Sequence, residues 1–307
     1  MNKNIKIYLI LGILTCNLSL VTCHCYGWGG GVTAGAGLEF EYLAGARTGA
    51  MGEIGSALEN DISLLPYNPA GLANLTESQV GFDYMLGFGD LSFCRFVYNL
   101  PTDIGSFAVS LSSFDAGSAE LNFADGTVRV IKAQTDVVFT FSYAKEFFKG
   151  IPIGFSGKVI SSSLAERSAV QAFAIDAGGL FRVPVEGLRV GVCLQNMGGG
   201  LNYLTQAEPL PATLRAGLSY ELLEFGMIGG LEFKWLLNEG KIIPSLGGEY
   251  KFSENLAFRF GYIFGNTEGM TFGLGFNIKR YTFDYAISLV KDIAPFGNQR
   301  LGFKMQL

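Results

Sequence analysis

Histidine is almost absent from this sequence. The only one among 307 residues is His24, and it lies in an N-terminal stretch with the pattern of a targeting signal. A Ser–His–Asp hydrolase triad therefore has no histidine available, and metal sites lack their commonest ligand. The glycines at 27–31 are not followed by Lys and Ser or Thr, so they do not make a phosphate-binding loop. These absences predict a protein that is not an enzyme and that uses no metal ion and no cofactor.

Charged residues are scarce as well, at 16% of the chain, whereas about 25% is usual in soluble domains. No uninterrupted apolar run of about 20 residues follows the first thirty positions, which disfavours membrane-spanning helices. The formal charge of −5 gives no reason to expect a nucleic acid as a partner. With 42 glycines and 26 phenylalanines, the chain has the composition of a membrane protein that crosses the bilayer without helices.

Residues 1–25 are predicted to be a signal peptide, with two early lysines followed by an apolar core at 7–21. Ordinary cleavage near Cys25 is one interpretation. The alternative is a loose lipoprotein box that ends at Cys23, with Cys23 acylated, although Thr22 departs from the usual small residue there. We favour the first interpretation, in which these cysteines are removed with the signal.

Two later cysteines, Cys94 and Cys193, remain after cleavage. They could pair as a disulfide in an oxidising compartment. However, Cys193 lies in the middle of a predicted strand, on its less apolar face. We therefore favour the interpretation that both are small packing residues.

Side chains from residue 255 onward alternate between apolar and small or polar types. A period of two predicts β-strands, and segments of about 9–11 residues are long enough to cross a bilayer when tilted. An aromatic face with a glycine-rich, polar opposite face is typical of a transmembrane β-barrel, with lipid outside and a polar lumen inside. The clearest segment has Leu256, Phe258, Phe260, Tyr262 and Phe264 on one face and Ala257, Arg259, Gly261 and Ile263 on the other.

The whole pattern predicts an all-β fold, an antiparallel transmembrane barrel of about fourteen strands at 76–307. The alternation is weakest at 91–99 and 168–182. Short connections and long connections alternate along the chain, as expected when periplasmic turns are short and extracellular loops are long. The predicted strands are 76–88, 91–99, 104–114, 134–147, 151–165, 168–182, 187–196, 212–222, 225–237, 242–252, 255–264, 269–278, 281–290 and 299–307.

Residues 26–75 differ from the rest and are predicted to form an N-terminal plug. Apolar residues at 54, 58, 62 and 65 have helical spacing and predict a short amphipathic helix that ends at Pro66. Asn68 and Pro69 then form a good N-cap and first position for a second short helical turn. Because this block is too small to bury a core of its own, we expect it to pack inside the barrel.

The stretch 45–52 reads GARTGAMG, and 67–73 reads YNPAGLA. Together with a signal peptide and about fourteen strands, these stretches resemble the N-terminal hatch of the long-chain fatty-acid transporter (FadL-like) superfamily, and more narrowly its short PorV-like, uncharacterised branch. The resemblance implies a monomeric plugged barrel that takes up hydrophobic molecules by lateral diffusion. The chain departs from the transporters in its shorter length and in ending at Leu307 rather than an aromatic residue.

Charged residues on the predicted inner faces allow two interpretations. They could form a binding path in which Arg215 and Arg259 contact an acidic ligand or the plug, or a mixed-sign network that pins the plug and satisfies buried charges. The inward charges are Lys158, Arg189, Arg215, Glu221, Glu232, Lys234, Glu249, Lys251, Arg259, Asp284 and Lys304.

The plug also offers candidate gate residues, namely Arg47, Asn68, Pro69 and Ala70. The Asn-Pro element could move when a ligand binds, or it could be a fixed cap and turn. We predict outer-membrane transport or binding of small hydrophobic molecules such as fatty acids, in contact with lipid. The alternative is a structural or secretion-accessory barrel that binds protein partners at its extracellular or periplasmic rim.

Overall fold

The computed structural model describes residues 33–87, 90–122, 126–166, 169–203, 207–265, 269–290 and 298–307. The predicted signal peptide, with Cys23, lies outside these residues. Among them, no helix is both long enough and apolar enough to span a bilayer.

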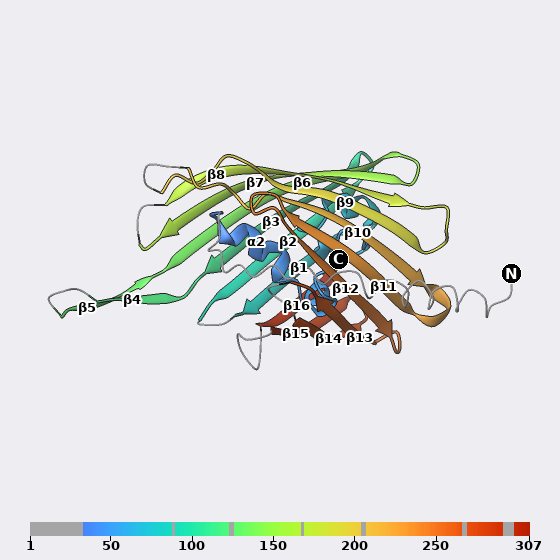
Figure 1. Ribbon diagram of the computed structural model, residues 1–307. Coiled ribbons are helices and arrows are strands. Elements are labelled where there is room, and N and C mark those ends of the chain that lie inside the picture. The colour runs from blue at the N-terminus through green and yellow to red at the C-terminus, as the bar shows by residue number, and fades with distance from the viewer. Residues whose placement is uncertain are drawn as a thin grey trace. The chain divides into compact units, whose positions relative to one another are not determined.

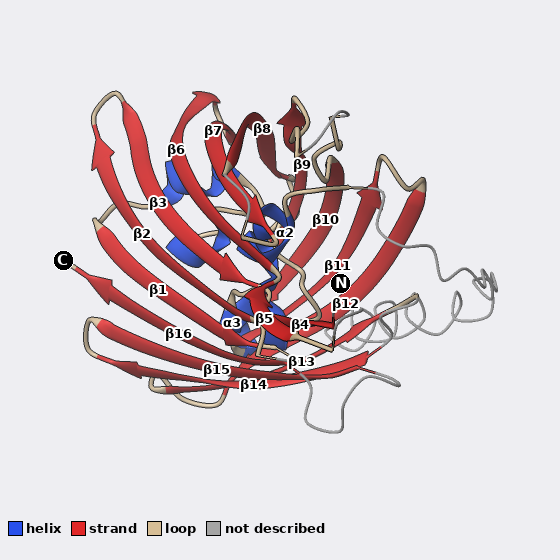
Figure 2. Cartoon of the chain, turned by 90° about the vertical axis from the view of Figure 1, so that its left-hand side faces the viewer, coloured by secondary structure: helices blue, strands red, loops and turns tan. Residues whose placement is uncertain are grey.

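Fourteen antiparallel strands form a closed barrel (Figures 1 and 2). Closure comes from β16 pairing back to β1, with Gln79 opposite Gln306 and Leu86 opposite Gln299. The predicted number of strands is confirmed. The barrel strands are β1 (Gln79–Leu86), β2 (Ser92–Thr102), β3 (Gly105–Asp115), β6 (Gln134–Phe148), β7 (Ile151–Leu164), β8 (Val170–Arg182), β9 (Leu188–Gly198), β10 (Thr213–Leu222), β11 (Met227–Leu236), β12 (Lys241–Lys251), β13 (Leu256–Ile263), β14 (Gly269–Ile278), β15 (Tyr281–Val290) and β16 (Asn298–Gln306).

The connections separate into two ends. At the short-turn end, strands are joined by brief links such as those at 149–150 and 279–280. At the long-loop end, the links include 116–133 and 199–212. This confirms the predicted alternation. The N-terminal part of the chain leads into β1 at the short-turn end.

The long connection between β3 and β6, for which no strand was predicted, is not a simple loop. It contains a separate two-stranded sheet, β4 (Ser118–Asn122) and β5 (Val128–Lys132), which projects beyond the barrel (Figure 1). Every residue of β4 is exposed. The alternation was present but short: Ala119 and Leu121 alternate with polar residues in β4, and Val128 and Val130 flank Arg129 in β5.

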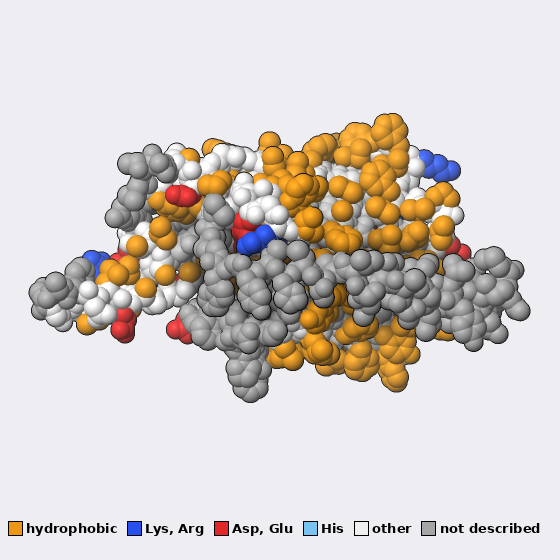
Figure 3. Space-filling model, in the orientation of Figure 1, with side chains coloured by type: hydrophobic (Ala, Val, Ile, Leu, Met, Phe, Trp, Pro, Cys, Tyr) orange, Lys and Arg blue, Asp and Glu red, His pale blue; other side chains and the backbone are white. Residues whose placement is uncertain are grey.

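The outer wall is apolar, as the alternation predicts. In β13, Phe258 and Phe260 are 45% and 54% exposed, whereas Ala257 and Arg259 are buried. Figure 3 shows hydrophobic side chains gathered over this wall. An exposed aromatic belt of this kind is suited to lipid rather than to water. Exposed phenylalanines of the wall include Phe82, Phe96, Phe139, Phe141, Phe155, Phe173, Phe233, Phe272, Phe276 and Phe283.

The two cysteines are free and lie on different faces of the wall. Cys94 shares the outward face of β2 with Phe96, and Cys193 is buried on the inward face of β9. The disulfide alternative is therefore wrong, and only Cys193 is buried as a packing residue would be.

Residues 33–75, here called the N-terminal segment, pass through the inside of the barrel (Figure 2). Helix α2 (Ala36–Leu43) packs against β2, β3 and β6, and α3 (Ala46–Ala50) packs against β13 to β16. The 3₁₀ turn η1 (Ile62–Leu64) contacts β1 and β2, and η2 (Pro69–Asn74) contacts β6 to β8. A further 3₁₀ turn, η3 (Leu223–Phe225), links β10 and β11.

The predicted amphipathic helix over 54–65 is wrong. This part of the chain makes turns: Gly52 and Glu53 just before it and Asn60 within it have positive φ angles, which an α-helix does not contain. The apolar residues at helical spacing are nevertheless all buried, because the lumen surrounds this stretch on every side. Because the barrel wall packs against this stretch on all sides, its apolar residues are buried whatever their spacing. Helical spacing was therefore not evidence of a helix here. The actual helix α2 starts in the glycine-rich part that offered no periodic signal.

Candidate functional site

The inward faces of the strands hold most of the buried charge of the described residues. Several inward positions missed in the sequence analysis, including Asp83, Arg95 and Arg300, are as buried as those that were identified. Strict alternation along β1, β2 and β16 places these three residues on the lumen face, so the signal that could have found them was present in the sequence.

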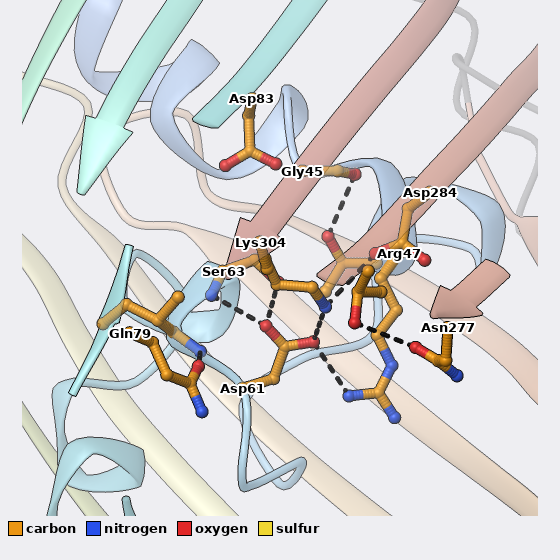
Figure 4. Close-up of polar contacts among 12 residues, drawn as sticks. Gly45, Arg47, Asp61, Ser63, Gln79, Asp83, Asn277, Asp284 and Lys304 are labelled. Carbon is orange, nitrogen blue, oxygen red and sulfur yellow. Dashed lines mark hydrogen bonds and ion pairs between the residues drawn. The ribbon is translucent and has the colours of Figure 1, made fainter. Parts of the chain in front are cut away.

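Six of these charges form a closed ring of alternating sign, here called the six-charge ring. Two members come from the N-terminal segment and four from the wall strands β12, β13, β15 and β16. Figure 4 shows Arg47 and Asp61 reaching across to the wall strands. The ring runs through Arg47, Asp61, Lys304, Asp284, Arg259 and Glu249, with successive contacts of 3.1, 2.5, 3.2, 2.6, 2.6 and 2.9 Å.

Charge compensation keeps Asp61 of the six-charge ring ionised although it is buried. Burial alone raises the pKa of the Asp61 carboxyl, but the charges of Lys304 and Arg47 outweigh it and hold the pKa well below its ordinary range. Asp61 also accepts hydrogen bonds from the backbone and the hydroxyl of Ser63. The carboxylate therefore stays charged through the physiological pH range, and the segment stays attached to the wall.

Arg215 on β10 is buried on the lumen face. Its guanidinium pairs with Glu232 at 3.2 Å and sits 4.1 and 4.8 Å from the ring centres of Tyr42 and Tyr67. Glu232 accepts hydrogen bonds from the backbone of Gly55 and from Ser56 in the N-terminal segment. Of the two arginines predicted to contact an acidic ligand or the plug, Arg215 thus touches the segment directly, and Arg259 lies in the six-charge ring.

A third charged group ties α2 to the opposite wall. Lys158 on β7 contacts Glu41 of α2 at 2.9 Å and Asp176 on β8 at 2.8 Å. Asp176 accepts a hydrogen bond from the backbone of Asn196, where the pairing of β8 and β9 shifts register. Burial alternates regularly along β8, so the weak pattern at 168–182 reflects its residue types and not an irregular strand.

Asn68, Pro69 and Ala70, the predicted gate residues, form a tightly bonded cap. The Asn68 side-chain oxygen accepts from the Ala70 amide at 3.0 Å, and its amide donates to carbonyls of Ser56 and Gly179 at 2.8 and 3.0 Å. The first contact is the N-cap bond that the sequence predicts. The other two tie the cap to the segment and to the wall, which is the geometry of a fixed turn.

The wall makes room for this cap at Gly154. A Cβ atom there would lie 2.4 Å from the Pro69 carbonyl carbon, so we expect Gly154→Val to lower the free energy of unfolding by about 1–3 kcal/mol. Gly157, on the outward face of the same strand, meets nothing within 4 Å. Gly157→Val is the matched control and should change stability by less than about 0.5 kcal/mol. Urea midpoints, followed by heat-modifiable migration in gels, measure both; equal midpoints would contradict the seating of the cap.

The long-loop half of the lumen has a different lining. Apolar side chains from β6, β7, β8 and the 199–212 loop surround the start of the N-terminal segment, and the Ala34 amide donates to the Pro209 carbonyl at 2.8 Å. This group, here called the apolar cluster, was missed because its wall members sit at inward positions where polar side chains were expected. Its buried members are Leu38, Val138, Ile160, Ala172, Ala174, Leu201 and Leu210.

Comparison with known proteins shows a shared fold. No family model and no curated protein sequence matches the chain. Its structure is similar to the P. putida toluene transporter TodX, with a TM-score of 0.65, 14% identity, and 86% of this chain and 98% of that chain covered. It is also similar to the Ralstonia pickettii toluene transporter TbuX (0.61, 15%, 86% and 98%) and to a Pseudomonas aeruginosa FadL homologue (0.57, 13%, 86% and 95%).

The chain has the barrel fold of these transporters. The resemblance to FadL-like proteins in the sequence analysis thus holds at the level of the fold, and the narrower resemblance to the PorV-like branch is not confirmed. At 13–15% identity, the match says nothing about individual site residues.

Proposed function

We propose that this protein is an outer-membrane barrel that binds small hydrophobic molecules, such as fatty acids, at the long-loop end of its lumen and passes them inward. It acts as a monomer in contact with lipid, and the N-terminal segment serves as a plug that blocks water. The observation that carries the proposal is the apolar cluster, because a water-filled lumen has no need of an apolar wall. Similarity of fold to toluene transporters supports it.

The apolar cluster is occupied by the plug itself. Leu38 of α2 is fully buried against Ile160 and its neighbours. A hydrophobic ligand would therefore compete with this part of the N-terminal segment for the same surface. The arrangement of the lumen fits that role, since the apolar cluster lies toward the long loops and the six-charge ring toward the short turns.

The predicted site residues take separate roles in this proposal. Arg47, Arg215 and Arg259 hold the plug in place through buried contacts, and an acidic ligand would reach Arg215 or Arg259 only by displacing a carboxylate. The C-terminal part of the plug is anchored by Asn68, Pro69 and Ala70. Movement on ligand binding is therefore assigned to the plug residues before Asn68.

Binding of a fatty acid and of toluene to the purified, refolded protein tests the proposal. We expect saturable binding that is lost when the barrel is unfolded. The control is circular dichroism of the same sample, which must show intact β-structure. Intact spectra without saturable binding would contradict the proposal.

A second candidate is a structural or secretion-accessory barrel that binds protein partners. The projecting β4–β5 hairpin favours it, because Leu121, Val128 and Val130 are 41%, 58% and 61% exposed there. The extensive ion pairing of the lumen also fits a barrel that never opens. The binding experiment separates the two functions, since this one needs no hydrophobic ligand.

A further inference from the structure

A charged pocket opens at the short-turn end of the barrel, opposite the apolar cluster. Its volume is about 360 Å³, within the range of small-molecule sites. The six-charge ring contributes Arg47, Asp61, Glu249, Arg259 and Lys304 to its lining. This pocket has no apolar surface comparable to the apolar cluster, so it does not suit the hydrophobic ligand proposed above.

Basic side chains outnumber acidic ones in this pocket. Seven lysines and arginines line it against four carboxylates, whereas the whole chain has 27 acidic and 22 basic residues. Asp284 adds one more carboxylate beside the lining through its contacts with Arg259 and Lys304, and the excess of positive charge remains. A concave surface with an excess of one sign of charge attracts ions of the other sign.

Three cations at the rim account for the excess. Lys251 ends β12, and Lys279 and Arg280 form the turn between β14 and β15. All three are exposed, and their side chains make no ion pair with any residue that the structure describes. The deeper cations are already neutralised by the six-charge ring and by Glu59 and Glu221, which pair with Arg189 at 2.6 and 2.8 Å.

We propose that this short-turn pocket binds a small multivalent anion that carries carboxylate or phosphate groups. Lys251, Lys279 and Arg280 hold the anion from the rim, with Asn277 and Thr282 beside them. Ammonium and guanidinium groups bind such oxygens by charge-assisted hydrogen bonds. The site goes beyond the transport of hydrophobic molecules and does not depend on it.

The anion can come from solution or from the headgroup of an anionic lipid, and the experiment distinguishes the two sources. The full mature barrel is placed in nanodiscs of zwitterionic lipid and titrated with citrate and with inorganic phosphate by calorimetry. A second set of nanodiscs contains phosphatidylglycerol. We expect saturable citrate binding that weakens as salt is raised; loss of citrate binding in the phosphatidylglycerol discs would identify the lipid headgroup as a competing occupant of the same site.

Substitutions decide whether the pocket is responsible. The triple variant K251Q/K279Q/R280Q should weaken citrate binding at least about tenfold. Lys149→Gln, which removes an exposed lysine from another short turn of the same end, is the matched control and should bind as the unmodified protein does. If the triple variant does not fold, Arg280→Gln alone should weaken binding about threefold. Absence of saturable binding, or equal affinity in the triple variant and the control, would overturn the proposal.

Discussion

Replacing Arg259 by methionine is expected to lower the free energy of unfolding by about 3–5 kcal/mol. Arg259 is buried and lies 2.6 Å from both Glu249 and Asp284. Its removal leaves two buried carboxylates without one of their cations, and that uncompensated burial is the main cost. The effect should spread to the plug, because Glu249 also holds Arg47 at 2.9 Å.

Urea unfolding of the refolded protein measures the loss, and limited proteolysis reports whether the N-terminal segment is released. Arg129→Met is the matched control. Arg129 pairs with Glu166 at 2.9 Å, but its side chain is 66% exposed, so its loss should cost less than about 1 kcal/mol. If Arg259→Met were as mild as Arg129→Met, the six-charge ring would not be what holds the plug.

Replacing Leu38 by aspartate is expected to raise the apparent affinity for a hydrophobic ligand by at least about tenfold. A carboxylate at this fully buried position would have to leave the apolar cluster, because burying it unpaired costs several kcal/mol. Asp136, which already accepts a hydrogen bond from the Gly37 amide, adds repulsion. Displacement of the segment raises the fraction of protein with a free cluster, and apparent affinity rises in proportion to that fraction.

The same substitution on the wall should act in the opposite direction. Ile160 belongs to the apolar cluster but not to the plug, so Ile160→Asp makes the binding surface itself polar and should reduce affinity. Leu121→Asp in the exposed β4 strand controls for added charge and should change nothing. Fatty-acid titrations of the three variants provide the measurement; affinity changes of the same sign for Leu38→Asp and Ile160→Asp would refute competition between ligand and plug.

Much of the candidate site could be predicted from period-two alternation. Arg215, Glu232, Glu249 and Arg259 were placed on the lumen face because a strand offers each side chain only two directions. The members of the N-terminal segment that meet the wall could not be predicted in the same way. Asp61 lies in a turn, where no periodicity fixes direction, and it contacts Lys304, which follows it by 243 positions.

The N-terminal segment was the least predictable part for a related reason. Its apolar residues have helical spacing at 54–65, yet the wall around them imposes turns. At Gly247 and Gly261, a Cβ atom would lie 2.0 and 2.1 Å from the backbone of Met51 and Gly52. Where the backbone packs this closely against the barrel wall, steric contact with the wall determines its conformation, and local propensity does not.

Sequence alone determined the barrel of this protein: the number of strands, the apolar outer face, the charged inner face and the two kinds of connection. Each of these follows from the two-residue repeat of a strand and from a bilayer that requires every backbone polar group to be paired. Only the tertiary structure decided how the N-terminal segment is fixed and where the lumen is apolar or basic. Those properties depend on which inward side chains of different strands contact the same stretch of this segment, and strand register and packing determine those contacts.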